Sequence, residues 1–244
     1  MYTKSEKIFL NSVLQKVGKG INQYKMIGAD DKVMVAVSGG KDSLVMLETL
    51  VLRRKYLPIK YELCAVHIVV DDVPFKANPK FLKQLCDELE VPLIIKETHA
   101  GIDDFEKKKR ACFTCSWNRR KELFQLCADK GFNKIAFGHH MDDMLETLLM
   151  NMSYHAEISS MPPIISMFEG LFEIIRPMVL LNNAELKRYA NLKKFMKMEK
   201  NCPYEDQTNR NAMRQIIDQI AQISPKARTN MFRAMQNVNE EYLP

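Results

Sequence analysis

The sequence has no long hydrophobic run. None of its apolar stretches approaches the roughly 20 residues that a membrane-spanning helix requires. The opening Met-Tyr-Thr-Lys-Ser-Glu-Lys does not lead into the apolar core of a signal peptide. We therefore expect a soluble, cytoplasmic protein with no membrane partner. Internal repeats and low-complexity tracts are also lacking, which argues against a repeat architecture.

Length and charge set broad limits on the kind of protein. A chain of 244 residues is long enough for one large α/β domain with its own core. Lysine and arginine outnumber aspartate and glutamate by 36 to 30, a net charge of +6 that allows a polyanionic partner without demanding one. In a reducing compartment the six cysteines do not form a disulfide framework. Metal binding, catalysis and core packing remain open for them.

Apolar and amphipathic segments alternate through the middle of the chain. The pattern predicts strands at 33–37, 63–69, 93–96 and 134–137, and helices at 43–54, 79–89, 115–130 and 142–152. This alternation is typical of a parallel sheet with helices on both faces, whose ligands bind at the carboxyl ends of the strands. The loops that begin near Ser38, Val70, Thr98 and Gly138 should therefore share one edge of the sheet.

The flanking segments differ from this pattern. Helical spacing predicts an amphipathic helix over about 5–27, and residues 164–168 and 172–175 read as a strand pair joined by a turn. From Asn182 onward the pattern is helical. We therefore predict an N-terminal helical segment at 1–30, an α/β domain at 31–180 and a helical C-terminal region at 181–244.

A phosphate-binding loop follows the first predicted strand, where the sequence reads Ser-Gly-Gly-Lys-Asp-Ser. Gly39 and Gly40 let the backbone approach an anion, and the helix that follows directs free N–H groups at it. Lys41 adds a positive charge, while Ser38 and Ser43 can donate hydroxyl hydrogen bonds. The alternative is a turn that merely starts a helix.

The loop resembles the PP-loop of ATP pyrophosphatases, which split ATP into AMP and pyrophosphate, and it lacks the spacing of kinase and GTPase P-loops. The resemblance implies a fold like that of the adenine nucleotide alpha hydrolases, with ATP as cofactor. The residues expected to bind the nucleotide are Ser38, Gly39, Gly40, Lys41, Asp42, Ser43, Gly138 and His139.

Acidic residues follow the fourth predicted strand, where the sequence reads Gly-His-His-Met-Asp-Asp from Gly138. Asp42 with Asp142 or Asp143 offers oxygen ligands of the kind that Mg²⁺ prefers. Alternatively, Asp142 caps the helix, and Asp143 or Glu146 complements the helix dipole. The residue types alone leave both interpretations open.

A Cys-x-x-Cys motif places Cys112 and Cys115 at or just before the start of a predicted helix. The helix N-terminus and nearby Arg119 and Arg120 should lower the pKa of both thiols, which favours the metal-binding thiolate. By itself the motif fits zinc, an iron–sulfur cluster, a redox dithiol or chance. Cys202, in an irregular segment, brings the count to three, one short of a structural zinc site but enough for a [4Fe-4S] cluster with one open iron.

The other cysteines and a histidine fit structural roles. Cys64, Cys86 and Cys127 lie in apolar strand or helix patterns and should pack in the core, because free cysteine behaves as a small hydrophobic residue. His67, within a predicted strand, should be a structural histidine.

Several motifs together resemble the tRNA 2-thiocytidine synthetases, the TtcA family, over nearly the whole chain. They are the PP-loop, the Cys-x-x-Cys with its trailing Arg-Arg, Gly-His-His-Met-Asp-Asp, Met-Pro-Pro, Ile-Ile-Arg-Pro and Ala-Met-Gln-Asn-Val. The resemblance implies ATP-dependent thiolation of cytidine 32 in tRNA through an adenylated base, with Mg²⁺ and a [4Fe-4S] cluster. It further implies a cysteine desulfurase or other sulfur donor, and a homodimer. The implied cluster ligands are Cys112, Cys115 and Cys202, and the implied catalytic residues are Lys41, Asp42 and Asp143.

Positive charge surrounds the three cysteines and predicts RNA contacts, although basic helices are commonly only solvated faces. Trp117, Phe113 or Tyr204 could stack on an unpaired base. The basic residues are Lys107, Lys108, Lys109, Arg110, Arg119, Arg120, Lys121, Lys193, Lys194, Lys197, Lys200, Arg210 and Arg214. Alternative functions are 2-thiouridine synthesis, lysidine-type tRNA ligation, and a non-catalytic RNA-binding or redox-sensing protein that holds zinc or a cluster.

Overall fold

The computed structural model describes residues 2–71, 77–99, 111–196 and 209–242. Within them, six strands form one sheet in the order β3-β2-β1-β4-β6-β5. All neighbouring pairs are parallel except β5 with β6, so the sheet has one antiparallel edge strand. The strands are β1 Lys32–Ala36, β2 Glu62–Val70, β3 Leu93–Thr98, β4 Lys134–Ala136, β5 Ile164–Met167 and β6 Phe172–Ile175.

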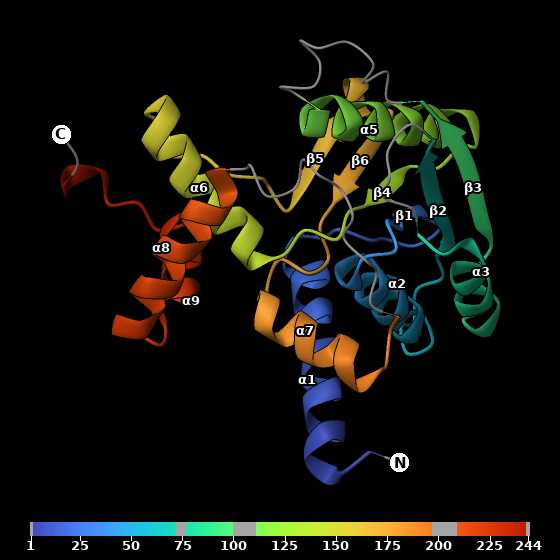
Figure 1. Ribbon diagram of the computed structural model, residues 1–244, viewed down its shortest axis with the longest axis horizontal. Helices are drawn as coiled ribbons and strands as arrows, with labels where there is room; N and C mark the ends of the chain where they lie inside the picture. Colours follow the sequence, from blue (N-terminus) through green and yellow to red (C-terminus); the bar gives the residue numbers. More distant parts are fainter. Residues whose placement is uncertain (1, 72–76, 100–110, 197–208, 243–244) are drawn as a thin grey trace.

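Helices cover both faces of the sheet (Figure 1). The helix α5 lies alone on one side in this view, and α1, α2, α3 and α7 lie on the other, while α6, α8 and α9 form a group at the left, beyond the β5 edge of the sheet. The helices are α1 Lys4–Gln23, α2 Lys41–Arg54, α3 Pro79–Glu88, α5 Ala111–Asp129, α6 Met141–His155, α7 Asn183–Leu192, α8 Asn209–Ile223 and α9 Ala227–Ala234. Short 3₁₀ turns occupy Phe168–Gly170 and Glu240–Tyr242.

Alternation along β1 explains how one strand serves both layers. Val33 and Val35 belong to the core that contains α1 and α2, whereas Met34 faces the smaller core beneath α5. On that side Met34 clusters with Leu123 and Cys127 of α5. Because successive side chains in a strand point to opposite faces, a run of consecutive apolar residues is what a strand buried on both faces requires.

The strand order reverses between β1 and β4. The chain runs from β1 to β2 and β3 on one side, then returns to β4 on the other side of β1. Loops that leave the carboxyl ends of such a pair diverge and open a crevice, which is the usual ligand site of an open α/β sheet. The loop after β1 is the Ser38–Ser43 loop, and the loop after β4 begins at Phe137.

The predicted α/β class, parallel sheet and strand pair are confirmed. One addition is that β6 joins the main sheet next to β4, with Ile175 opposite Ala136. The helix predicted to begin at Cys115 begins at Ala111 and therefore contains Cys112 as well. The long N-terminal helix is confirmed, but it ends at Gln23, and its Ile8 is 61 % exposed rather than part of the buried face.

The C-terminal part is helical where it is described, as predicted from Asn182 onward. Asn182 begins this region as the N-cap of α7, where its side chain accepts a hydrogen bond from the Glu185 N–H and the Glu185 carboxylate accepts one from the Asn182 N–H. The three-part division of the chain stays a prediction. In the described ranges, the helices are too short or too polar to cross a membrane.

Candidate nucleotide and cysteine site

The loop after β1 adopts a phosphate-cradling geometry. Gly39 has φ of 87°, a left-handed conformation that glycine adopts at little cost. The Gly40 N–H donates to the Ser38 hydroxyl at 3.3 Å, and the Ser43 hydroxyl donates to the Gly40 carbonyl at 2.8 Å. Helix α2 begins at the next residue, Lys41, so its free N–H groups face the loop.

Gly138, after β4, packs directly against this loop. A Cβ atom at Gly138 would lie 3.3 Å from the Ser43 backbone nitrogen and 3.4 Å from the Asp42 carbonyl carbon. The two loops at the strand-order reversal therefore touch, and the absence of a side chain at Gly138 permits it. The structure brings together the predicted residues Ser38 to Ser43, Gly138 and, next in the chain, His139.

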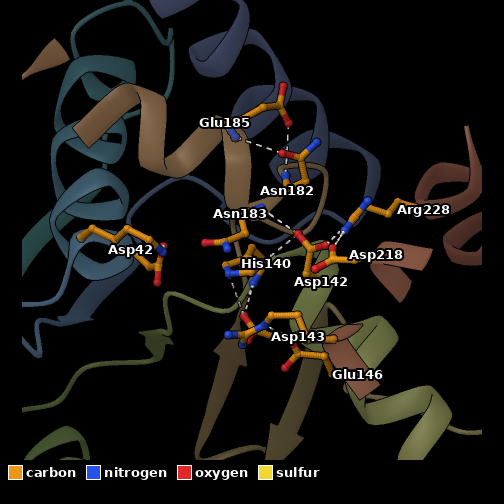
Figure 2. Close-up of polar contacts among 12 residues, drawn as sticks. Asp42, His140, Asp142, Asp143, Glu146, Asn182, Asn183, Glu185, Asp218 and Arg228 are labelled. Carbon is orange, nitrogen blue, oxygen red and sulfur yellow. Dashed lines mark hydrogen bonds and ion pairs between the residues drawn. The ribbon is translucent and has the colours of Figure 1, made fainter. Parts of the chain in front are cut away.

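Lys41 and Asp42 form an ion pair within the loop, with 2.6 Å between Nζ and Oδ1. Both side chains are about one-third exposed, so water and ligands reach them. Figure 2 shows Asp42 to one side of the group around His140 and Asp143. Among the described residues, no cluster of three or more His, Cys, Asp or Glu side chains could hold a metal ion.

Asp142 has a structural role that neither interpretation of the sequence foresaw. Its carboxylate accepts a hydrogen bond from the Asn183 N–H at 2.6 Å and one from Arg228 Nε at 2.7 Å (Figure 2). The residue is 5 % exposed. Asp142 therefore ties α6 to the start of α7 and to α9, and it does not cap α6.

The cap of α6 is formed by its neighbours. His140 is the N-cap residue, and its backbone N–H donates to the Asp143 carboxylate at 2.9 Å. One Asp143 oxygen also lies 3.4 Å from His140 Nε2, and the other lies 4.0 Å from Arg210 of α8. Asp143 thus has a capping contact, while its side chain remains 19 % exposed beside the loop after β4.

Glu146 is almost fully buried and pairs with Arg214 of α8 at 2.7 Å. Burial raises the pKa of this carboxyl above its usual value, and the hydrogen bond from Arg214 opposes that rise. The pair joins α6 to α8, so Glu146 does not simply complement the helix dipole. Arg210 and Arg214, predicted to contact RNA, both face acidic residues of α6.

Helix α5 carries the Cys-x-x-Cys motif toward the same edge of the sheet. It runs antiparallel to the strands that it connects, so its N-terminal end lies near their carboxyl ends. Cys115 is half-buried, and the neighbouring Phe113 and Trp117 are 66 % and 57 % exposed. Their rings stack with centroids 6.4 Å apart and planes 12° apart.

The side chain of Cys112 and the whole of Cys202 lie outside the described residues, as do Lys107 to Arg110, Lys197, Lys200 and Tyr204. The other three cysteines are confirmed as core residues, since Cys64, Cys86 and Cys127 are at most 8 % exposed. His67 is also structural, because its Nδ1 lies 2.7 Å from the Val37 carbonyl oxygen.

Comparison with known proteins agrees with this geometry. The family model for the PP-loop domain matches residues 10–220. The chain belongs to the PP-loop family. Among its relatives is the tRNA-cytidine(32) 2-sulfurtransferase of Marinobacter nauticus, 33 % identical over 99 % of this chain and 82 % of the relative. The enzyme of the same name from Burkholderia vietnamiensis is 34 % identical over 98 % of this chain and 72 % of the relative.

Solved structures share the PP-loop fold. The U34-tRNA thiolase NcsA from Methanococcus maripaludis, determined with its [4Fe-4S] cluster, superposes with a TM-score of 0.78 at 20 % identity. The alignment covers all of this chain and 82 % of the thiolase. An NH₃-dependent NAD synthetase from Campylobacter jejuni superposes with a TM-score of 0.52 at 15 % identity over 95 % of this chain and 89 % of its own.

Sequence reasoning missed the roles of two arginines at this edge of the PP-loop domain. One is Arg228, whose partner Asp142 lies 86 positions away and which no local motif singles out. The other is the role of Arg176, which follows β6 and is 8 % exposed despite its charge. The available signal was the position of Arg176 between an apolar strand and a proline. That position does not indicate which residues the guanidinium contacts.

Proposed function

We propose that this protein is an ATP-dependent, iron–sulfur-dependent tRNA sulfurtransferase that forms 2-thiocytidine at position 32. One observation supports the proposal above all. A PP-loop touches the loop after β4 in a chain that is 33–34 % identical to tRNA-cytidine(32) 2-sulfurtransferases over almost its full length. The two matches cover 99 % and 98 % of this chain, and so they extend over its PP-loop and its Cys-x-x-Cys motif.

In the first step the C2 oxygen of cytosine attacks the α-phosphorus of ATP. An oxygen–phosphorus bond forms, the bond between the α-phosphorus and the bridging oxygen breaks, and pyrophosphate leaves. The N–H groups at the start of α2 and the Lys41 ammonium stabilise the negative charge on the departing pyrophosphate. The Ser38 and Ser43 hydroxyls, 3.2 Å apart across the loop, orient its backbone.

In the second step a sulfur nucleophile attacks C2, the C2–O bond breaks, and AMP leaves with the original carbonyl oxygen. The adenylate is needed because an unmodified carbonyl oxygen is a poor leaving group. Cys112, Cys115 and Cys202 would hold a [4Fe-4S] cluster, which would supply a coordination site for sulfide. The donor set fits, because Cys112 and Cys115 are three residues apart on one helix and thiolates are the ligands that iron–sulfur clusters take.

Mg²⁺ would screen the phosphate charge in this site. Asp42, at the start of α2, and Asp143, beside the loop after β4, are the carboxylates that we assign to it. Mg²⁺ commonly takes only one or two protein carboxylates and completes its shell with phosphate oxygens and water, so a larger acidic cluster is not required. We assign catalytic roles to Lys41, Asp42 and Asp143, and nucleotide contacts to His139.

The RNA substrate would lie over the N-terminal end of α5. The stacked, exposed Phe113 and Trp117 offer a surface for an unpaired base, and each lies two positions from Cys115 in the chain. We further propose that the protein acts in the cytoplasm, receives sulfur from a cysteine desulfurase or a related donor, and works as a homodimer. Light scattering coupled to size exclusion at several concentrations tests the homodimer directly.

The proposal is tested by ATP turnover. Anaerobically purified protein should convert ATP to AMP and pyrophosphate only when a tRNA transcript with cytidine at position 32 is present. A transcript with uridine at that position is the matched control and should leave the ATP intact. Equal turnover with both transcripts, or release of ADP and phosphate, would contradict the proposal.

A further inference from the structure

Three nitrogen-rich side chains converge beside the PP-loop, on the face of the sheet that α5 covers. In the parallel register of β4 and β6, Ile135 lies opposite Ile174 and Ala136 opposite Ile175, so Phe137 and Arg176 follow as the next pair. Ile135 and Ile174 both pack under α5. Because side chains alternate along strands, Phe137 and Arg176 point to that same face.

His139 and Arg120 reach this position from two other segments. The His139 ring lies 5.8 Å from the Phe137 ring, measured between centroids, so His139 lies next to the start of its own loop. Arg120 is three residues before Leu123, which packs against the same core. Side chains three residues apart share a helix face, and Arg120 therefore points toward the carboxyl edge of β4 and β6. We call these residues the Arg120–His139–Arg176 cluster.

Two buried nitrogen atoms of this cluster have no hydrogen-bond partner among the described residues. Arg176 is 8 % exposed and donates from Nη1 to the Pro162 carbonyl, but its Nε is buried and has no hydrogen-bond partner in the described part of the chain. His139 Nδ1 is likewise inaccessible and unpartnered among those residues. Buried polar atoms of folded proteins are almost always satisfied, so an unpaired buried guanidinium nitrogen indicates a missing acceptor.

Among the described residues, the two arginines of the cluster also have no acidic partner. Within the described ranges, no carboxylate forms an ion pair with Arg120 or Arg176, whereas Arg210 and Arg214 nearby are both paired with acids of α6. Burial first, and then the charge of Arg120, lowers the pKa of Arg176 to about 10. Burial, followed by Arg176, Arg120, Arg210 and His140, lowers the pKa of His139 to about 3. An anion beside these groups would relieve all of these effects.

We propose that the Arg120–His139–Arg176 cluster is a second phosphate site, separate from the PP-loop cradle. Arginine binds phosphate through paired N–H donors, and a neutral histidine can add another. The phosphate belongs either to the RNA backbone next to the target base or to the nucleotide, at its α-position. This inference deepens the proposed function and rests on it for the choice between these two sources.

The test measures binding rather than thiolation. Arg120→Gln and Arg176→Gln are compared with Lys130→Gln, which removes one exposed charge just beyond the far end of α5. The probes are a tRNA transcript, AMP and inorganic pyrophosphate, each titrated at several salt concentrations. Arg120 is exposed, so its replacement keeps the test valid even where loss of Arg176 and its Pro162 contact unfolds the protein.

If the cluster binds a phosphate of the RNA backbone, RNA binding should weaken about tenfold in each arginine variant. The slope of log affinity against log salt concentration should then fall in magnitude by about one. AMP and pyrophosphate binding then stay unchanged. If the cluster instead binds the α-phosphate of the nucleotide, the arginine variants should bind AMP more weakly and should bind RNA and pyrophosphate as the unmodified protein does. If Arg120→Gln binds RNA and AMP as tightly as Lys130→Gln does, the proposal of a second phosphate site is wrong. A protein that passes this test but thiolates no RNA would contradict the proposed activity alone.

Discussion

Gly138 lies so close to Ser43 that a single methyl group between them would be 3.3 Å from the Ser43 backbone nitrogen. Contacts this short force one neighbour to shift by a few tenths of an ångström, and the neighbour here is the first turn of α2. Gly138→Ala should therefore weaken ATP binding several-fold, because the N–H groups that face the phosphates move. Isothermal titration with ATP measures the loss.

Gly28→Ala is the matched control for this change. A Cβ atom at Gly28 would have Asp31 Oδ2 as its nearest neighbour at 3.7 Å, which is ordinary van der Waals contact. The control should bind ATP like the unmodified protein. Full affinity in Gly138→Ala would show that the contact between the two loops does not shape the nucleotide site.

The contacts of the Asp142 carboxylate with Asn183 and Arg228 predict that replacing Asp142 lowers the stability of the fold and does not affect metal binding. Asp142→Asn removes the charge that pairs with Arg228 while α6, α7 and α9 remain packed around the site. Arg228 is partly exposed and keeps its contact with Asp218, so the loss is that of one charged hydrogen bond, and we expect the free energy of unfolding to fall by about 2 kcal/mol. Urea denaturation measures this change, with the exposed Asp87→Asn as the control.

A double-mutant cycle with Arg228→Met separates this pair from the rest of the network. Arg228 also contacts Asp218, so its replacement alone should cost something of its own. The double variant should lose less stability than the two single variants lose in sum, because the interaction between Asp142 and Arg228 can be lost only once. Strict additivity would mean that Asp142 and Arg228 do not stabilise each other.

The stacked pair Phe113 and Trp117 predicts a fluorescence signal. Trp117 is the only tryptophan in the sequence and is 57 % exposed, so its emission reports on this surface alone. Stacking of an RNA base on the ring should quench that emission. Phe113→Ala should weaken RNA binding about tenfold, the lower part of the range for one stacked base.

Tyr56→Ala serves as the control for the aromatic pair. Tyr56 is 83 % exposed, just beyond the end of α2, well separated in the chain from α5. RNA affinity should be unchanged in this variant. Quenching that is absent at saturating RNA, or equal effects of the two substitutions, would exclude the pair as an RNA contact.

His139 predicts a pH dependence of stability. Burial, together with Arg176, Arg120, Arg210 and His140, lowers the pKa of its imidazole to about 3, against about 6.5 in an unfolded chain. Between these values the unfolded state binds more protons than the folded state, so this contribution to stability is fully present above pH 6.5 and is lost as pH falls toward 3. The His139→Gln variant has no imidazole at this position and therefore lacks this pH-dependent contribution.

The check compares unfolding free energies of the two proteins at pH 7 and pH 4.5. Stability of the unmodified protein should fall more steeply than that of His139→Gln, since titration of the carboxyl groups is common to both. Identical slopes would mean that the His139 imidazole is solvated in the folded protein.

The sequence predicted the layers of the fold because consecutive apolar residues such as Val33 to Val35 and the glycine loop after them have a local physical signature. It also predicted that Gly138 lies near the PP-loop, since strand ends of a parallel sheet share an edge. It could not predict the partners of Asp142, because Arg228 comes from a helix 86 positions later. Residue type alone made Asp142 equally suited to metal binding and to helix capping.

The start of α5 was wrong for a related reason. Thr114, directly before Cys115, is a residue type that favours the N-cap position, yet it lies inside the helix, which already begins at Ala111. Ile8 shares the helical spacing of the apolar residues in α1, yet the core covers only the later turns of the helix, from Leu10 to Ile21. The cluster of Arg120, His139 and Arg176 joins three separate segments, which no single motif reveals.

The three cysteines carry the central claim, that the PP-loop activates the base and Cys112, Cys115 and Cys202 hold the centre that delivers sulfur. The direct measurement is nucleoside mass spectrometry of a tRNA transcript treated with ATP, Mg²⁺, sulfide and anaerobically purified protein, with Cys64→Ala as the control. We predict that 2-thiocytidine forms at position 32 in an amount equal to the AMP released. Cys115→Ala should form no 2-thiocytidine and should contain no iron or sulfide, although it still binds ATP. Undiminished 2-thiocytidine from a variant that lacks all three cysteines would contradict the account.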